Sequence, residues 1–258
     1  MKIVSVMNEK GGIGKTITAS SIAYILAAEC KKRVLVIDGD QQGNASQLFG
    51  EYEPEGRGLS ELLEKHRSVG GEYATKELIV NTVYENVDII PSNGYLMRTN
   101  MLLMKEENDQ IRRLVKALEE VEKDYDYCIC DCGLILDMTV TNILIASDLV
   151  IAPVKLGGFE VAAVENLKQQ ISDLRQISPD IQLKVLITMR QANKASLELE
   201  NWLKANTEFK TFRTAIRRSV AVEKSTIAFK PLPVFSKNCI ATKEYREVVR
   251  ELLEDMEG

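Results

Sequence analysis

The segment Glu9-Lys10-Gly11-Gly12-Ile13-Gly14-Lys15-Thr16 constrains this chain more than any other feature, because it combines three glycines with two lysines and a threonine. It follows the apolar run Lys2–Met7 and precedes a stretch rich in Ala, Ser and Ile. Glycines in such a strand–loop–helix setting let backbone amides turn inward around phosphate oxygens. The helix start adds a partial positive charge. The segment therefore predicts a phosphate-binding loop.

The side chains of this loop predict how it would hold a nucleoside triphosphate and Mg²⁺. Lys15 has the reach to contact the β- and γ-phosphates, and the Thr16 hydroxyl is a suitable Mg²⁺ ligand. The alternative is a chance glycine turn that carries two solvated lysines. The predicted nucleotide-binding residues are Lys10, Gly11, Gly12, Ile13, Gly14, Lys15, Thr16 and Ile17.

Acidic residues follow two further apolar runs. Asp38 and Asp40 come after Val34–Ile37, and Asp131 ends the run that begins at Tyr127. Ligands bind at the carboxyl ends of strands in open α/β sheets, so these carboxylates predict a metal and water site. We predict Asp38 and Asp131 as metal-binding groups with Thr16, and Asp40 as the group that positions the attacking water. The alternative for Asp38 and Asp40 is capping of the next helix.

Apolar runs alternate with amphipathic stretches over the whole length. Continuous apolar runs of this kind are typical of parallel strands buried on both faces. The pattern predicts an α/β fold with one doubly wound, mostly parallel sheet, covered by helices on both faces, in a single domain spanning residues 1–258. The expected strands are Lys2–Met7, Arg33–Asp38, Val87–Pro91, Tyr127–Asp131, Leu149–Pro153, Leu183–Thr188 and Leu232–Phe235. The expected helices are Thr16–Cys30, Asp109–Lys123, Phe159–Ile177, Ala195–Lys204 and Thr242–Met256.

The three motifs, in this order, resemble those of the ParA/MinD family of deviant Walker ATPases, and within it the ParA/Soj-type partition proteins. The resemblance extends from the phosphate loop and Asp38–Asn44 through Val87–Asn93, Ile151–Val154 and Phe159 to Ile216–Val220 and Lys230-Pro231. It implies an ATP-bound homodimer that binds DNA without sequence preference, and slow ATP hydrolysis stimulated by a ParB-like partner. It also implies that Lys10 reaches the partner subunit's nucleotide, so that Lys10, Lys15 and Asp40 form the catalytic set.

This chain departs from the family pattern at four places. Gln41 stands where a proline usually follows the second aspartate, and Gly133-Leu134 stands where Pro-Pro usually follows Asp-Cys. Arg217 replaces a proline, and Ala221 replaces an arginine. None of these changes removes a phosphate- or metal-facing group, but the family's DNA contacts cannot be transferred directly.

The charge distribution bears on whether the chain binds DNA or a membrane. The chain has a net charge of −5, yet residues 204–237 contain eight basic residues against two acidic ones. Such a patch would bind phosphates in a salt-sensitive way, although a solvated face of ion pairs is the alternative. The predicted DNA-binding residues are Arg213, Arg217, Arg218, Lys224 and Lys230. A MinD-like membrane role is the runner-up, but the acidic end 251–258 would be repelled by anionic lipid.

Other features are expected to have structural roles. Cys128, Cys130 and Cys132 alternate and fit one buried face of a strand better than an iron–sulfur site. The sole histidine, His66, lies in a charged stretch and gives little support to a metabolic ligase, which stays as a further alternative. No signal sequence and no run of about 20 apolar residues is present, so we expect a cytoplasmic, nucleoid-associated protein. Because the first strand begins at residue 2, we expect no N-terminal DNA-binding domain.

The sequence says little about how the base of a nucleotide would be held. Met189 and Arg190 follow the end of an expected strand, and they are the candidates for contact with an adenine.

Overall fold

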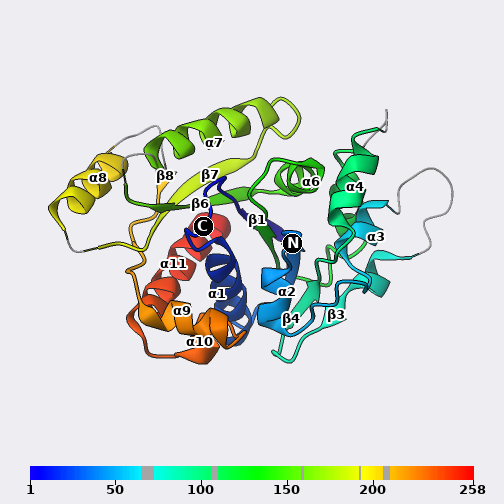
Figure 1. Ribbon diagram of the computed structural model, residues 1–258, viewed down its shortest axis with the longest axis horizontal. Coiled ribbons are helices and arrows are strands. Elements are labelled where there is room, and N and C mark those ends of the chain that lie inside the picture. The colour runs from blue at the N-terminus through cyan, green and yellow to red at the C-terminus, as the bar shows by residue number, and fades with distance from the viewer. Residues whose placement is uncertain (65–72, 106–109, 158–159, 192, 206–209) are drawn as a thin grey trace.

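A twisted, mostly parallel β-sheet organises the computed structural model, which describes residues 1–64, 73–105, 110–157, 160–191, 193–205 and 210–258 (Figure 1). His66, the expected loop at 68–71, Phe159 and Glu208 lie outside these residues. In the described part the sheet has eight strands in the order β3-β4-β2-β5-β1-β6-β7-β8, and only β3 runs antiparallel to its neighbour. The strands are β1 Lys2–Val6, β2 Val34–Gly39, β3 Val80–Asn81, β4 Val87–Ile90, β5 Tyr127–Cys132, β6 Leu149–Lys155, β7 Gln182–Thr188 and β8 Lys210–Thr211.

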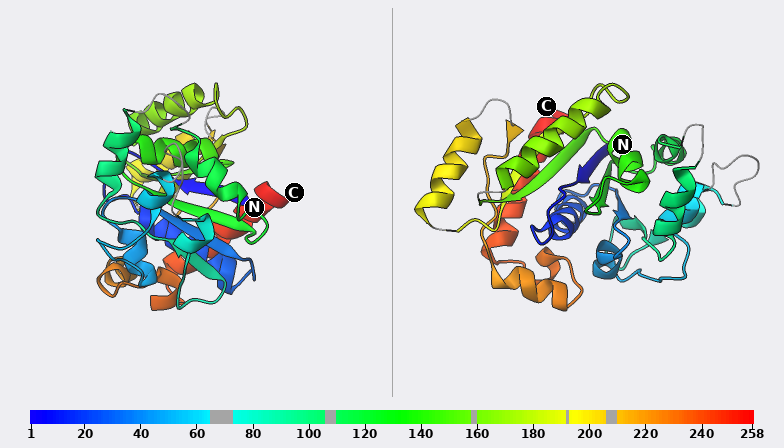
Figure 2. Two further views of the ribbon diagram at one scale, coloured as in Figure 1. Left: turned by 90° about the vertical axis from the view of Figure 1, so that its right-hand side faces the viewer. Right: turned by 45° about the horizontal axis from the view of Figure 1, so that its top comes forward.

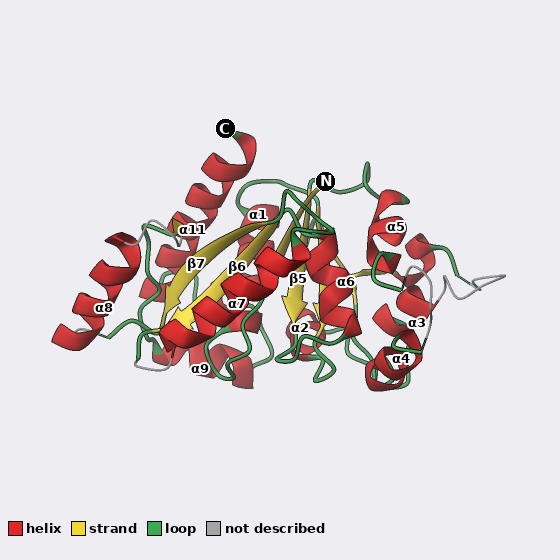
Figure 3. Ribbon diagram, turned by 90° about the horizontal axis from the view of Figure 1, so that it is seen from above, coloured by secondary structure: helices red, strands yellow, loops and turns green. Residues whose placement is uncertain are grey.

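Helices cover both faces of this sheet, which confirms the predicted fold class (Figure 3). α1 Lys15–Ala28 and α11 Ile240–Glu257 lie on one face, and α6 Met138–Ala146 and α7 Glu160–Leu174 lie on the other (Figure 2). The remaining helices are α2 Asn44–Phe49, α3 Leu59–Glu64, α4 Leu96–Leu103, α5 Arg113–Glu119, α8 Lys194–Ala205, α9 Val220–Ile227 and α10 Leu232–Phe235, with a 3₁₀ turn at Thr75–Leu78.

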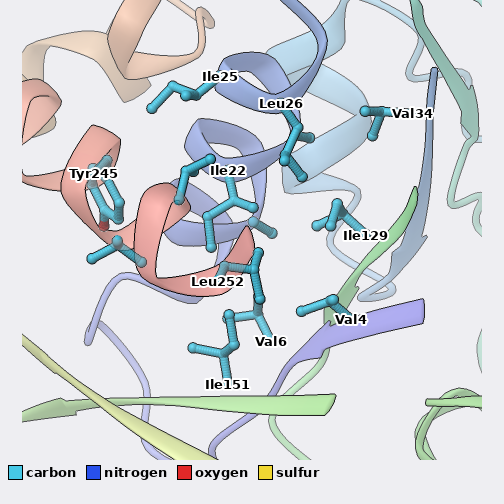
Figure 4. Close-up of a cluster of buried hydrophobic side chains, with 14 of the residues drawn as sticks. Val4, Val6, Ile22, Ile25, Leu26, Val34, Ile129, Ile151, Tyr245 and Leu252 are labelled. Carbon is cyan, nitrogen blue, oxygen red and sulfur yellow. The ribbon is translucent and has the colours of Figure 1, made fainter. Parts of the chain in front are cut away.

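Alternation along the strands divides the apolar side chains between two cores. In β2, Val34 and Val36 join the core under α1 and α11, whereas Leu35 and Ile37 join the core on the opposite face. Figure 4 shows the first core, in which Ile22 of α1 and Leu252 of α11 pack over Val4 and Val6 of β1. Burial on both faces explains why the strands read as continuous apolar runs rather than as alternating ones.

One expected strand is wrong, and two short strands are additional to those expected. Leu232–Phe235 forms α10, a single helical turn that follows Pro231 and contains Pro233. Proline lacks an N–H and fits the first turn of a helix, where that group has no intrahelical partner, so the two prolines favour a helical start over a strand. β3 and β8 are two residues long and give no periodic signal.

Candidate nucleotide site

The phosphate loop and both acidic motifs meet at the carboxyl edge of the three central strands. β5 lies between β1 and β2, and its Asp131 is level with Val6 on one side and Asp38 on the other. Parallel pairing therefore gathers segments that are far apart in the sequence at a single edge. The predicted site residues between positions 10 and 131 lie together there, as the motifs lead us to expect.

The phosphate loop curves over the start of α1. Gly12 and Gly14 have φ angles of 69° and 90°, in the left-handed region that glycine adopts without strain. The Lys15 ammonium reaches back across the loop and donates to the Lys10 carbonyl at 3.1 Å. Burial lowers the pKa of Lys15, while the nearby carboxylates of Asp131 and Asp40 oppose that shift. The loop thus holds a cation at its centre, where a phosphate group would replace the carbonyl as acceptor.

A cavity of about 370 Å³ opens beside this loop. The predicted residues Gly11–Ile17 and Asp40 line it, and its size is in the range that small-molecule ligands occupy. Sequence reasoning assigns no role to the rest of the lining, because Gln42 and Asn44 enter only as part of the Asp38–Asn44 motif and the other residues come from helices and loops without a motif. The remaining lining residues are Gln42, Asn44, Gln47, Leu48, Leu134, Thr226 and Phe229.

Asp131 is a carboxylate that lacks a well-formed hydrogen bond to any of the described residues. Both of its oxygens are buried without such a partner. Burial, followed by the charge of Asp38, raises the pKa of Asp131 well above its usual range, and the nearby Thr16 hydroxyl opposes the rise. Buried charged groups normally pair or coordinate metals. An unsatisfied acid beside Lys15 and the Thr16 hydroxyl therefore fits a hard divalent cation such as Mg²⁺.

Asp38 has a different environment from Asp131. Its Oδ2 accepts hydrogen bonds from the Ser46 amide and hydroxyl, both at 2.7 Å, and its Oδ1 accepts from the Asp40 amide at 3.2 Å. Burial raises the pKa of Asp38 to about 6, and these hydrogen bonds oppose the rise. Asp38 thus anchors α2 and the loop that carries Asp40, as the capping alternative predicts. Its role at a metal stays a prediction.

Asp40 is half-buried and lines the cavity from the loop that follows β2. Its carbonyl accepts a 2.7 Å hydrogen bond from the Ser92 hydroxyl, and the Ser92 amide in turn donates to the Ser46 hydroxyl. The loop is therefore braced from two sides. The sequence does not predict the bracing by Ser46 and Ser92, because it depends on how the segment after β4 packs against α2 and the Asp40 loop.

A second cavity adjoins the first through Ile13, Gly14 and Ile17 and lies beside the end of β7. Met189, one of the two candidates for contact with the base, borders it with a φ angle of 51°. Arg217 and Arg218 also line this cavity, so two of the predicted DNA-binding residues lie next to the candidate phosphate site.

Ion pairs with acidic side chains neutralise much of the predicted basic patch. Arg213 pairs with Glu254 at 2.5 Å, Arg217 with Glu244, and Arg218 with Glu223 at 3.4 Å. Lys224 and Lys230 are exposed, and within the described part of the chain neither has a carboxylate within ion-pair distance. The two lysines are therefore the stronger DNA candidates among the five predicted residues.

The described residues contain no group of acids, histidines and cysteines arranged to hold a metal by themselves. Cys128, Cys130 and Cys132 are free and buried in β5, facing the core of α5–α7 as the alternation indicates. None of the helices described is long and apolar enough to cross a bilayer.

Together, a parallel sheet, a two-lysine glycine loop at its central edge and an unsatisfied strand-end aspartate define a P-loop nucleotide-binding protein. A family model described as an AAA domain matches residues 1–185. Soj of Bacillus subtilis (strain 168), a sporulation initiation inhibitor protein, is 30% identical over 97% of this chain and 98% of its own length. The chromosome partitioning protein ParA of Caulobacter vibrioides is 28% identical, over 98% of this chain and 94% of its own.

Solved structures share the fold of this chain. Cobyrinic acid a,c-diamide synthase from Mycobacterium smegmatis, with bound ADP and magnesium, superposes with a TM-score of 0.83 at 25% identity and covers 100% of this chain and 96% of its own. A plasmid partition protein from Borrelia burgdorferi bound to AMPPNP shares the fold, with a TM-score of 0.83 at 23% identity over 99% of each chain. The chain belongs to the family of ParA/Soj-type partition ATPases.

Proposed function

We propose that this chain is a single-domain, ATP-binding partition switch that hydrolyses ATP slowly and acts in the cytoplasm on DNA. The observation that carries this proposal is the unsatisfied Asp131 carboxylate beside Lys15, which suits a magnesium–triphosphate complex. The likeness to Soj and ParA over nearly the whole chain supports the partition role.

The residues of the site divide into distinct tasks under this proposal. Lys15 and the amides of 11–16 bind the phosphates, and Thr16 and Asp131 hold Mg²⁺, with Asp38 behind them. The metal ion neutralises charge on the phosphate oxygens when it is bound. Asp40, held by its braced loop at the cavity, orients the attacking water.

A second copy of the chain is the proposed cover of this site. Lys10 is exposed at the loop and has no acidic partner among the described residues. An apolar rim lies at the cavity: Leu134 and Phe229, which line it, are 45% and 57% exposed, and Ile135 and Ile227, close to them in the sequence, are 71% and 77% exposed. A neighbouring subunit would bury this apolar rim and bring its nucleotide to Lys10.

The proposed function requires two binding partners and has one competing alternative. We propose non-specific DNA and a ParB-like protein as partners, on the strength of the family alone. The competing function is an ATP-dependent ligase, favoured by the likeness to the diamide synthase. ATP turnover that rises with DNA and the partner protein would support the partition switch, whereas turnover that requires a small acid substrate would support the ligase.

Sedimentation with and without MgATP tests the switch directly. We expect wild type to dimerise only with MgATP, and Lys15→Ala to lose about 100-fold in ATP affinity and to stay monomeric. Lys10→Ala should bind ATP yet remain monomeric, while Asp40→Ala should dimerise without hydrolysis. Lys123→Ala, which alters an exposed lysine remote from both cavities, serves as the control. Wild type that fails to bind ATP, or Lys10→Ala that dimerises normally, would overturn the proposal.

A further inference from the structure

The cavity beside the end of β7 is lined in part by residues outside the phosphate loop. Residues 216–218 run along this strand end, where the Ile216 amide donates to the Ile187 carbonyl at 2.8 Å and the Arg190 amide donates to the Ile216 carbonyl at 2.9 Å. Residues 190 and 217 also form a parallel bridge. This backbone pairing fixes Arg217 at the edge of the cavity that it lines.

Both carboxylate oxygens of Glu244 in α11 accept hydrogen bonds from Arg217. Oε2 accepts the Arg217 backbone amide at 2.8 Å, and Oε1 accepts its Nε. The Glu244 side chain is nearly buried, whereas half of the Arg217 side chain is exposed. A proline at position 217 would have neither donor, so the arrangement depends on the residue that this chain carries there. Glu244 therefore sets the position of the guanidinium relative to the cavity.

This pairing changes what Arg217 can recognise. The carboxylate balances its charge, so the side chain offers little net attraction to a phosphate group. Its Nε is occupied, but its two terminal amino groups have no hydrogen-bonding partner among the residues that the structure describes. A planar guanidinium that is charge-balanced and fixed at a cavity edge is well suited to stack on an aromatic ring or to donate to ring nitrogens.

We infer that Arg217, positioned by Glu244, contacts the purine base of the bound nucleotide and contributes to its affinity. This inference rests on the proposed function, since it assumes that the phosphates occupy the glycine loop. The base then lies in the adjoining cavity, which shares Ile13, Gly14 and Ile17 with the phosphate site. Arg217 then lies at the opposite end of the nucleotide from Mg²⁺ and is no longer one of the DNA contacts.

Equilibrium binding of MgATP and of magnesium tripolyphosphate, which has no base, tests the inference. We expect Arg217→Ala to weaken ATP binding about tenfold and to leave tripolyphosphate binding within about twofold of wild type. Arg217→Lys keeps the charge but loses the planar group, so it should weaken ATP binding almost as much. Arg250→Ala, which removes an exposed arginine of α11 paired with Glu247, is the matched control and should change neither affinity.

The outcomes separate this inference from the proposed function. Wild type that binds neither ligand would contradict the phosphate site itself. Wild type that binds both, with Arg217→Ala weakening both equally or neither, would overturn the role of Arg217 alone. Thermal unfolding of each variant without ligand checks the fold. A variant that keeps its ATP affinity but loses DNA retention would return Arg217 to the DNA surface and also overturn the inference.

Discussion

Asp131 is buried where a charged carboxylate lowers the stability of the free protein. Its oxygens lack well-formed hydrogen bonds to the described residues, and burial raises its pKa. We predict that Asp131→Asn raises the free energy of unfolding without nucleotide by about 1 kcal/mol, because an unsatisfied buried charge is removed. The same variant should lose most of the stabilisation that MgATP gives to wild type. Urea unfolding with and without MgATP measures both effects.

Asp148→Asn is the contrasting control for that experiment. The Asp148 carboxylate is satisfied, since it accepts the Ile3 amide at 2.7 Å. The same substitution there should lower the stability of the free protein and leave the response to MgATP intact. If Asp131→Asn were destabilised like Asp148→Asn, or if MgATP stabilised it as much as wild type, the magnesium assignment would be wrong.

At the residue scale, the sequence locates the groups that belong to a motif and misses the groups that position them. Lys15, Thr16 and Asp131 follow from spacing and residue type, and the structure brings them to one edge of the sheet. Ser46, which anchors Asp38, and Glu244, which holds Arg217, are not predicted. Each contact joins residues whose pairing depends on how separate elements pack, and no local pattern records that.

At the scale of elements, Asp126 ties three strands together at the edge opposite the nucleotide site. Its carboxylate accepts the Arg33 amide at 2.8 Å and the Arg33 guanidinium at 3.2 Å, and its carbonyl accepts the Lys2 amide. These hydrogen bonds, the backbone one first, lower the pKa of Asp126 in the folded state. The starts of β1, β2 and β5 are thereby held in register.

A lowered carboxyl pKa makes this contribution pH-dependent in a defined direction. The stabilisation is present above the unfolded-state pKa near 4 and is lost as the pH falls through the lower folded-state value. We predict that Asp126→Asn is less stable than wild type at pH 7 by about 0.5 kcal/mol, a small value because solvent screens this exposed pair. The difference should shrink below pH 4, while ATP binding is unchanged. A difference that grows toward low pH would contradict the assignment.

The sequence predicts elements correctly where hydrophobic burial decides the structure. β1, β2, β5 and β6 are largely buried, and their apolar runs coincide with the expected strands. The run Leu232–Phe235 is equally apolar, but it packs as one helical turn after Pro231. Four residues are too few for periodicity to separate a strand from a helix, so turn chemistry and packing decide.

At the scale of the whole molecule, charge counted along a sequence window differs from charge displayed on a surface. The window 204–237 is strongly basic, yet Glu244, Glu251 and Glu254 of α11 lie outside it and face its arginines. Long-range packing thus neutralises part of a patch that the sequence shows as cationic. The cations that remain uncompensated in the described structure are the better guide to phosphate binding.

Lys224 and Lys230 allow a test of whether uncompensated cations, rather than paired ones, bind DNA phosphates. Both are exposed near the apolar rim, so an ATP-bound dimer would display two copies of each beside the subunit interface. We predict that Lys224→Gln with Lys230→Gln weakens ATP-dependent DNA retention and lowers the slope of log affinity against log salt by about 1 for each DNA phosphate that is no longer neutralised. Arg213→Gln removes one positive charge, from a residue already paired with Glu254, and should have much less than half of that effect. Retention measured over a salt series, with dimerisation checked separately, decides between the two sets, and equal losses per charge removed would show that the ion pairs of α11 open when DNA binds.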